Sequence, residues 1–179
     1  MKRRFVVVVA VVVLFCAGAI SASAQFRLDV DVAVPVYAGI QFGDLGVSGG
    51  ANLTKYLFLL PMLEATYQFG EGPVRFGVGA KAMTFLVESV LWPNAFIELD
   101  VDPVVIRGDF GGGLFLAFGL LNQVLNNSVT WVVPQIDVGF KLSDWFRLSG
   151  GAIALAPFNN MNNFGFLLYV NARFTALFK

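Results

Sequence analysis

The sequence predicts an all-β fold, a single eight-stranded antiparallel transmembrane β-barrel preceded by a cleavable signal peptide. Three observations lead to this prediction: an export signal at the N-terminus, alternation of apolar and polar residues with period two, and charges confined to one face of that alternation. The 179 residues leave room for one domain. We therefore expect a signal peptide over residues 1–24 and the barrel over residues 25–179.

The composition excludes several classes of function. The chain is 57% hydrophobic and 13% charged, which is too apolar for an ordinary soluble domain and too apolar for a disordered one. It contains no histidine, so a Ser–His–Asp triad and a histidine metal ligand are excluded, and we expect neither enzyme activity nor a cofactor. After residue 24, nine basic residues face twelve acidic ones, and this net charge of −3 argues against a nucleic-acid partner.

The N-terminus has the three parts of a secretory signal. Residues 2–4 are basic, residues 5–17 are uninterrupted apolar residues, and residues 22–24 read Ala-Ser-Ala. Small residues at this position are what signal peptidase requires, so cleavage is predicted before Gln25, with export through the Sec pathway.

Two alternatives to cleavage before Gln25 stay open at this point. An uncleaved anchor would need about 20 apolar residues to span a bilayer, and the apolar stretch is shorter. Acylation at Cys16 would need a small residue at the preceding position, which is Phe15. If cleavage follows Ala24, the mature chain has no cysteine and uses no disulfide or thiol chemistry.

Alternation is clearest in the first and last segments of the mature chain. In residues 26–42 every even position is apolar, whereas Arg27, Asp29 and Asp31 occupy odd positions. Residues 164–178 repeat the pattern. Between them, the same period predicts six more strands, over residues 54–69, 74–87, 95–106, 109–121, 130–142 and 146–156.

The predicted connections alternate in length. Short turns are expected at 70–73, at Arg107-Gly108 and at 143–145. Longer loops, rich in Gly, Asn and Ser, are expected over 43–53, 88–94, 122–129 and 157–163. Short turns on one rim and longer loops on the other are typical of an outer-membrane barrel with both termini in the periplasm.

The charged residues indicate which face looks inward. Fourteen of them fall on the strand face opposite the apolar face: Arg27, Glu64, Asp109 and the eleven residues of a predicted ion network in the lumen. That network comprises Asp29, Asp31, Arg75, Lys81, Glu98, Asp100, Asp102, Asp137, Lys141, Arg147 and Arg173. Arg or Lys on the lipid face at the bilayer midplane would cost about 2–4 kcal/mol, and no mid-strand charge lies there. A soluble lipocalin-like barrel would show the inverse pattern, so outer-membrane lipid is the expected surroundings.

Glu98, Asp100 and Asp102 share one face of one predicted strand. They could hold a cation through oxygen ligands. We favour ion pairing with the lumen bases, because unpaired charge in a narrow barrel is costly.

The outer half of the predicted lumen is apolar, in contrast to the charged half. Its residues define a predicted hydrophobic pocket, consisting of Leu60, Met62, Met83, Phe85, Phe96, Phe115, Trp131, Ile153, Leu155, Leu167 and Tyr169. Side chains fill the interior of most eight-stranded barrels, so a dry plug is the favoured interpretation. A pocket for an acyl chain or small hydrophobic molecule is the alternative. An aqueous pore is opposed by the strand number and by the apolar lining.

An export signal, eight alternating strands and a final strand ending in aromatic residues together resemble the small outer-membrane barrels OmpX, the OmpA transmembrane domain and the OmpW-like proteins. The segment Tyr169–Phe178 looks like the terminal signal read by the barrel assembly machinery, with the departure that Lys179 follows the last Phe. The resemblance implies a structural or surface-interaction role, or binding and passage of small hydrophobic molecules as in OmpW-like barrels. Barrel enzymes such as PagP and PagL rely on a histidine that this chain lacks.

Overall fold

The computed structural model describes residues 24–56, 59–70, 72–85, 88–113, 115–119 and 131–178. The predicted signal sequence therefore lies outside the described residues except for Ala24, and so does the predicted loop 122–129. None of the helical structure in the described ranges is long and apolar enough to cross a membrane.

Ten strands and one short 3₁₀ helix make up the described part of the chain. The strands are β1 (Gln25–Phe42), β2 (Val47–Asn52), β3 (Leu60–Phe69), β4 (Val74–Phe85), β5 (Glu88–Val101), β6 (Val104–Gly112), β7 (Leu116–Phe118), β8 (Trp131–Ser143), β9 (Phe146–Pro157) and β10 (Asn163–Phe178). The 3₁₀ helix η1 (Gly43–Leu45) joins β1 to β2.

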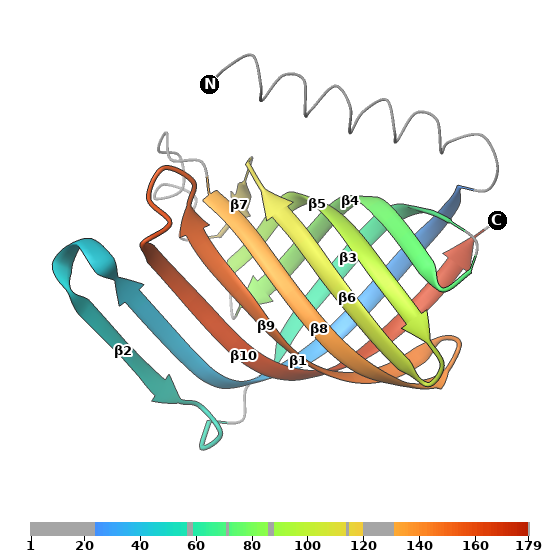
Figure 1. The fold of residues 1–179 in the computed structure, drawn as a ribbon, viewed down its shortest axis with the longest axis horizontal. Coiled ribbons are helices and arrows are strands. Elements are labelled where there is room, and N and C mark those ends of the chain that lie inside the picture. Colours follow the sequence, from blue (N-terminus) through green and yellow to red (C-terminus); the bar gives the residue numbers. More distant parts are fainter. Residues whose placement is uncertain are drawn as a thin grey trace, which may run out of the picture.

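Eight of the described strands close into an antiparallel barrel (Figure 1). Their order is β1, β3, β4, β5, β6, β8, β9 and β10, and pairing of β10 with β1 closes the ring. β7 pairs with β5, and β2 pairs with the end of β1. The predicted all-β, eight-stranded antiparallel barrel is thus confirmed.

The alternation in the sequence corresponds to the two faces of the wall. In β8, Ile136 and Val138 are more than half exposed on the outside, whereas Gln135 and Asp137, which alternate with them, are at most 5% exposed. Successive side chains of a strand point to opposite faces, so one register places the apolar face of the strand outside and its charged and amide side chains in the lumen.

The boundaries of β5 and β6 differ from the predicted ones. β5 includes residues 88–94, which the sequence analysis assigned to a loop, and the turn to β6 falls at Asp102-Pro103. Arg107 and Gly108, predicted as a turn, lie in the middle of β6. Asp–Pro is itself a turn signal, and the apparent alternation through Asp102 obscured it.

A β-bulge in β1 reverses its alternation between Pro35 and Tyr37, toward the end of the barrel where β1 ends and β10 begins. This end is called the outer end below. Pro35 pairs with buried Tyr169, but Tyr37 pairs with the exposed Leu168, so the register shifts by one residue between them. Paired residues share a face, and Tyr37 therefore lies outside. Phe42 is one of the even, apolar positions of residues 26–42, which the alternation assigns to the lipid face. That assignment was wrong for Phe42, because the extra residue moves it to the inner face.

The predicted strand 54–69 is shorter in the structure and begins at Leu60. The chain before it forms β2, which pairs with Tyr37–Phe42 of β1. This β1–β2 hairpin extends beyond the other strands, at the left of Figure 1, and every residue of β2 is exposed.

Candidate functional site

Arg107 lies at the centre of the charged half of the lumen. Its side chain is fully buried, and its guanidinium donates hydrogen bonds to three carboxylates. Nη1 is 3.0 Å from Asp29 Oδ2, Nε is 3.0 Å from Asp109 Oδ2, and Nη2 donates to Glu64. The guanidinium carbon also lies 3.7 Å from the centre of the Phe96 ring, a cation–π contact.

Lys81 and two amide side chains complete this central cluster. Lys81 Nζ donates to Gln135 Oε1 over 2.7 Å and lies 3.4 Å from Glu64 Oε2. Asn94 Nδ2 donates both to Glu64, over 3.0 Å, and to Asp109, over 2.8 Å. The two buried carboxylates therefore have charged and neutral donors at the same time, as buried charges require.

A second polar cluster lies between the charged and apolar halves. Arg173 Nε donates to Asp31 Oδ1 over 2.5 Å. Tyr169 Oη donates to Asp137 Oδ1 over 2.6 Å, and Gln135 Nε2 donates to Asp137 Oδ2 over 2.7 Å. Tyr169 is 2% exposed and presents its ring to the apolar cluster, so one residue joins the two halves.

Glu98 is bound by two arginines near the end of the lumen where β1 begins and β10 ends. Its carboxylate accepts hydrogen bonds from Arg27 Nη1 over 2.9 Å and from Arg147 Nη1 over 2.8 Å. Arg27 also donates from Nε to Asp29 over 2.8 Å. This arrangement links the end of the lumen to the central cluster around Arg107.

Asp100 forms the outermost ion pairs at the same end, with Arg75 Nη2 at 3.0 Å and Lys141 Nζ at 3.2 Å. Asp102, predicted in the same network, is exposed in the β5–β6 turn, so that part of the prediction was wrong. The other ten residues of the predicted network take part in ion pairs. In the described residues no group of acidic side chains is arranged to hold a metal ion.

The apolar half of the lumen contains a buried cluster. It consists of Ala33, Leu60, Met62, Trp92, Val133, Ile153 and Tyr169, with Met83, Val90, Phe115 and Leu167 packed against it half-buried. Seven of the predicted pocket residues are therefore brought together: Leu60, Met62, Met83, Phe115, Ile153, Leu167 and Tyr169.

The remaining four predicted pocket residues differ. Phe96 is buried between arginines in the charged half, because β5 starts earlier than predicted. Trp131 is half-buried, and Leu155 is 42% exposed near the outer end. The side chain of Phe85 lies outside the described residues.

Arg107 and Trp92, the largest members of the two clusters, were not predicted from the sequence. Both fell in segments assigned to connections. The turn dipeptide Asp102-Pro103 is the signal that could have placed them, since it moves two strands by about five residues.

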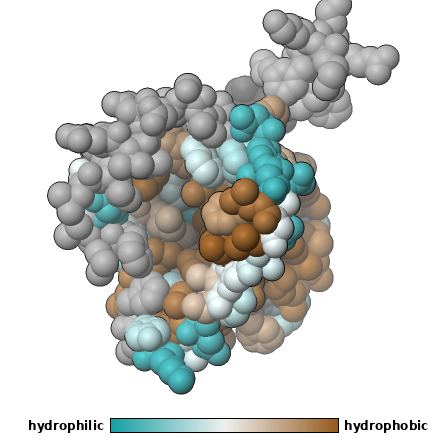
Figure 2. All heavy atoms as spheres, turned by 90° about the vertical axis from the view of Figure 1, so that its left-hand side faces the viewer, coloured by the Kyte–Doolittle hydropathy of each residue, from teal (hydrophilic) through white to brown (hydrophobic). Residues whose placement is uncertain are grey.

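The inner face remains apolar beyond the buried cluster, at the outer mouth. Ile40 is 48% exposed and Val47 is 51% exposed. Leu155 lies on the same face, because it pairs with Gly165, which in turn pairs with Ile40. Figure 2, which looks at this end of the barrel, shows a hollow with hydrophobic residues in its walls.

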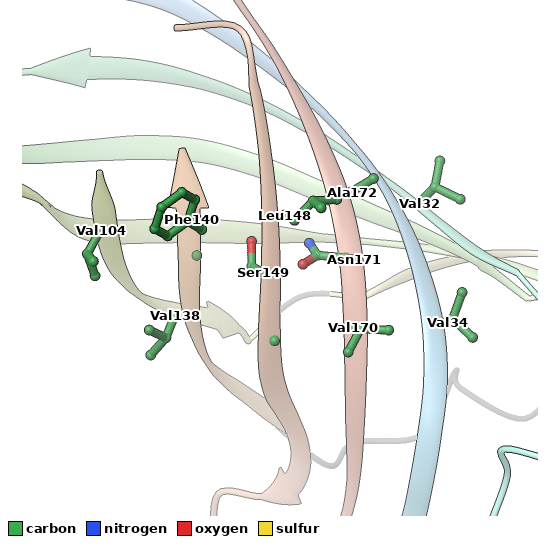
Figure 3. A pocket seen from close by; sticks show the side chains of 12 residues that line it. Val32, Val34, Val104, Val138, Phe140, Leu148, Ser149, Val170, Asn171 and Ala172 are labelled. Atoms are coloured by element: carbon green, nitrogen blue, oxygen red, sulfur yellow. The ribbon is translucent and has the colours of Figure 1, made fainter. Parts of the chain in front are cut away.

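The outer surface carries a shallow groove of about 760 Å³ across β1, β10, β9, β8 and β6. Gly150 pairs with Val138 on one side and Val170 on the other and contributes no side chain between them. Figure 3 shows the apolar side chains around the groove, among them Val34, Val138 and Val170. This hollow lies on the apolar exterior and adds no charged group.

Comparison with known proteins gives no family. No family model matches the sequence, and no curated protein matches it. Among solved structures, Neisserial surface protein A is similar at 16% identity and a TM-score of 0.48, over 86% of this chain and 99% of that one.

Two further structures are similar. A de novo designed transmembrane β-barrel has 9% identity and a TM-score of 0.43, over 87% of this chain and 98% of its own. Ail, the attachment invasion locus protein of Yersinia pestis, has 9% identity and a TM-score of 0.42, over 87% of this chain and 100% of its own.

Proposed function

We propose that this chain is an integral outer-membrane β-barrel of a diderm bacterium with a sealed lumen and a structural or surface-interaction role. The observation that carries the proposal is the distribution of charge. Arg107 and Arg173 are 0% exposed inside the barrel, whereas valines, leucines and phenylalanines cover the outside with exposures of about 40–60%. Soluble proteins have the opposite distribution, with apolar residues inside and charged residues outside. A barrel with an apolar outer surface is stable only when hydrocarbon surrounds its wall.

Aromatic rings near the start of β1 and the end of β10 support placement in a bilayer. Phe26 contacts Tyr67 and Phe178 with ring centres 5.7 Å apart, and Trp145 stacks on Phe174 at 6.1 Å. Trp and Tyr favour the headgroup level of a membrane, so these rings mark one interface.

The route to this membrane forms part of the proposal. Residues 1–24 direct export through the Sec pathway and are removed before Gln25. The barrel assembly machinery then recognises the terminal strand, in which aromatic residues recur up to Phe178.

Planar bilayer recording of the folded chain tests the sealed lumen. The ion network fills the charged half, and Leu60, Met62 and Trp92 are 2% exposed in the apolar half. We therefore expect no unitary conductance steps above those of protein-free bilayers. Steady steps that scale with protein concentration would overturn the sealed barrel, whereas failure of the protein to resist carbonate extraction from vesicles would overturn the membrane location itself.

Binding of a small hydrophobic molecule or acyl chain at the outer mouth is a second candidate function. The observation that favours it is the exposed apolar inner face formed by Ile40, Phe42, Val47 and Leu155, which continues into the buried cluster. Exposed contiguous apolar surface on a concave face is typical of ligand sites. The ion network below it would stop passage through the barrel.

Quenching of tryptophan fluorescence by a brominated fatty acid tests this binding. Ile40→Asp places a charge on the inner face, while Gln41→Asp places the same charge on the outer face of the same strand. We expect Ile40→Asp to weaken quenching about 10-fold and Gln41→Asp to leave it unchanged. Equal quenching in both variants would exclude the apolar face as the binding site.

A further inference from the structure

A small polar cavity lies in the lumen at the end where β1 begins and β10 ends. Its volume is about 40 Å³, and its charged lining comprises Arg27, Arg75, Lys141, Arg147, Glu98 and Asp100, with Asp144 at its edge. The side chains of Arg75 and Lys141 are 29% and 21% exposed, so solvent reaches the cavity from this end.

Three buried donors at this cavity have no partner. Arg147 is 6% exposed, and only its Nη1 is engaged, with Glu98. Among the described residues, its Nε and Nη2 atoms have no hydrogen-bond partner, and neither has Ser143 Oγ, which also lines the cavity. Buried donors without acceptors are costly, so the cavity requires an acceptor that the described side chains do not supply.

The charge around the cavity is positive. Four bases line it, and the carboxylates that face it are already paired. Glu98 accepts hydrogen bonds from Arg27 as well as Arg147, and Asp100 is bound by both Arg75 and Lys141.

Two further observations show that positive charge predominates around Arg147. Arg147 stands between two bases in the strand pairing, Lys141 on β8 and Arg173 on β10. The third acid, Asp144, is 98% exposed to solvent and makes one long contact of 3.4 Å with Lys141. An acceptor with negative charge therefore suits this position better than a neutral one.

We propose that this cavity binds one small monovalent anion of halide size. Nε and Nη2 of Arg147 and the hydroxyl of Ser143 supply its hydrogen bonds, and Lys141 and Arg75 supply charge from the open side. The cavity is small, at about 40 Å³, and the space is sufficient for a small anion.

Anomalous diffraction from crystals of the full chain grown in bromide tests the site directly. We expect a bromide peak within hydrogen-bond distance of Arg147 Nε or Nη2. Ordered water at the same position with no anomalous signal would overturn the proposal.

Thermal unfolding gives a second measurement in solution, with sodium bromide exchanged for sodium gluconate at constant ionic strength. An anion that binds only the folded state raises the unfolding temperature as its concentration increases. We expect Arg147→Gln to weaken the apparent bromide affinity about 10- to 100-fold, the effect of losing one charge-assisted donor pair. Glu98 keeps Arg27 in this variant, so the barrel retains its central ion pairs.

Lys55→Gln is the matched control, because it removes one positive charge from an exposed position in the connection between β2 and β3, which does not line the cavity. It should leave the bromide response unchanged. An equal bromide response in wild type, Arg147→Gln and Lys55→Gln would show that the salt acts through general screening, and it would refute the site.

Discussion

Arg107→Ala is the most informative single change, because it removes the one side chain that holds three buried carboxylates together. Arg107 is 0% exposed and donates to Asp29, Glu64 and Asp109. Breaking a buried ion pair by deleting one partner costs about 3–5 kcal/mol, because the remaining charge stays buried without compensation. Asn94 still donates to two of these carboxylates, so we expect the lower half of that range.

Urea unfolding of the barrel in lipid vesicles, followed by tryptophan fluorescence, measures this cost. Arg75→Ala is the matched control, since the same residue type forms ion pairs at 3.0 and 3.5 Å but its side chain is 29% exposed. An exposed pair contributes about 0–1 kcal/mol. If Arg107→Ala were no more destabilising than Arg75→Ala, the central network would not be what stabilises the lumen.

Two further pairs of variants test the packing of the interior and of the wall. Tyr169→Phe removes the hydroxyl that lies 2.6 Å from Asp137 and should lower the free energy of unfolding by about 1–3 kcal/mol in the same urea assay. Tyr67→Phe, on the exposed outer face, should change this free energy by less than about 0.5 kcal/mol. Gly79→Ala would place a methyl group against the backbone of β3 and should lower the free energy of unfolding by about 1–3 kcal/mol. In Gly49→Ala the new methyl group meets open space, so this variant should be neutral. Equal melting temperatures for the two variants would contradict the pairing of β3 and β4.

The architecture could be predicted from the sequence because the wall has one apolar and one polar face throughout. In β10, the outward residues Val170 and Phe174 and the buried residues Asn171 and Arg173 occupy the faces that their polarity predicts. Alternation of this kind fixes the face of each residue without fixing where a strand ends.

The centre of the ion network could not be predicted because it depends on strand ends. Arg107 was placed in a turn, and Asp102 was placed in the lumen. The turn was predicted at Arg107-Gly108 instead of Asp102-Pro103, which assigned the lumen position to Asp102 and the turn position to Arg107. The alternation within each strand was nevertheless predicted correctly. The partners of each charge come from strands far apart in the sequence, such as Arg107 and Asp29, 78 residues apart, and no local pattern encodes that distance.

The bulge in β1 limited the prediction at the outer end for a different reason. A single extra residue between Pro35 and Tyr37 changes which face Ile40 and Phe42 occupy. Both residues are apolar, and so the sequence pattern looks unbroken although the face has reversed. The exposed apolar inner face at the outer mouth was therefore not predictable from polarity alone.

The position of the hydrocarbon along the barrel gives the last prediction, which compares two exposed residues of the outer face. Val138 is 53% exposed in the middle of β8, and Ser48 is exposed on the hairpin beyond the barrel, where it pairs with the outward Gln41. A transmembrane strand needs only about 9–11 residues to cross the hydrocarbon, and β1 has 18, so its outer end and the hairpin extend past the bilayer core.

Val138→Arg should therefore cost about 2–4 kcal/mol in vesicles, whereas Ser48→Arg should cost about 0–1 kcal/mol. In a detergent micelle, which adapts its thickness to the protein, the difference should shrink. Equal costs for both variants in vesicles would mean that the hairpin lies in hydrocarbon. The unpaired edge of β2 would then face lipid without hydrogen bonds, which is the arrangement that a closed barrel avoids.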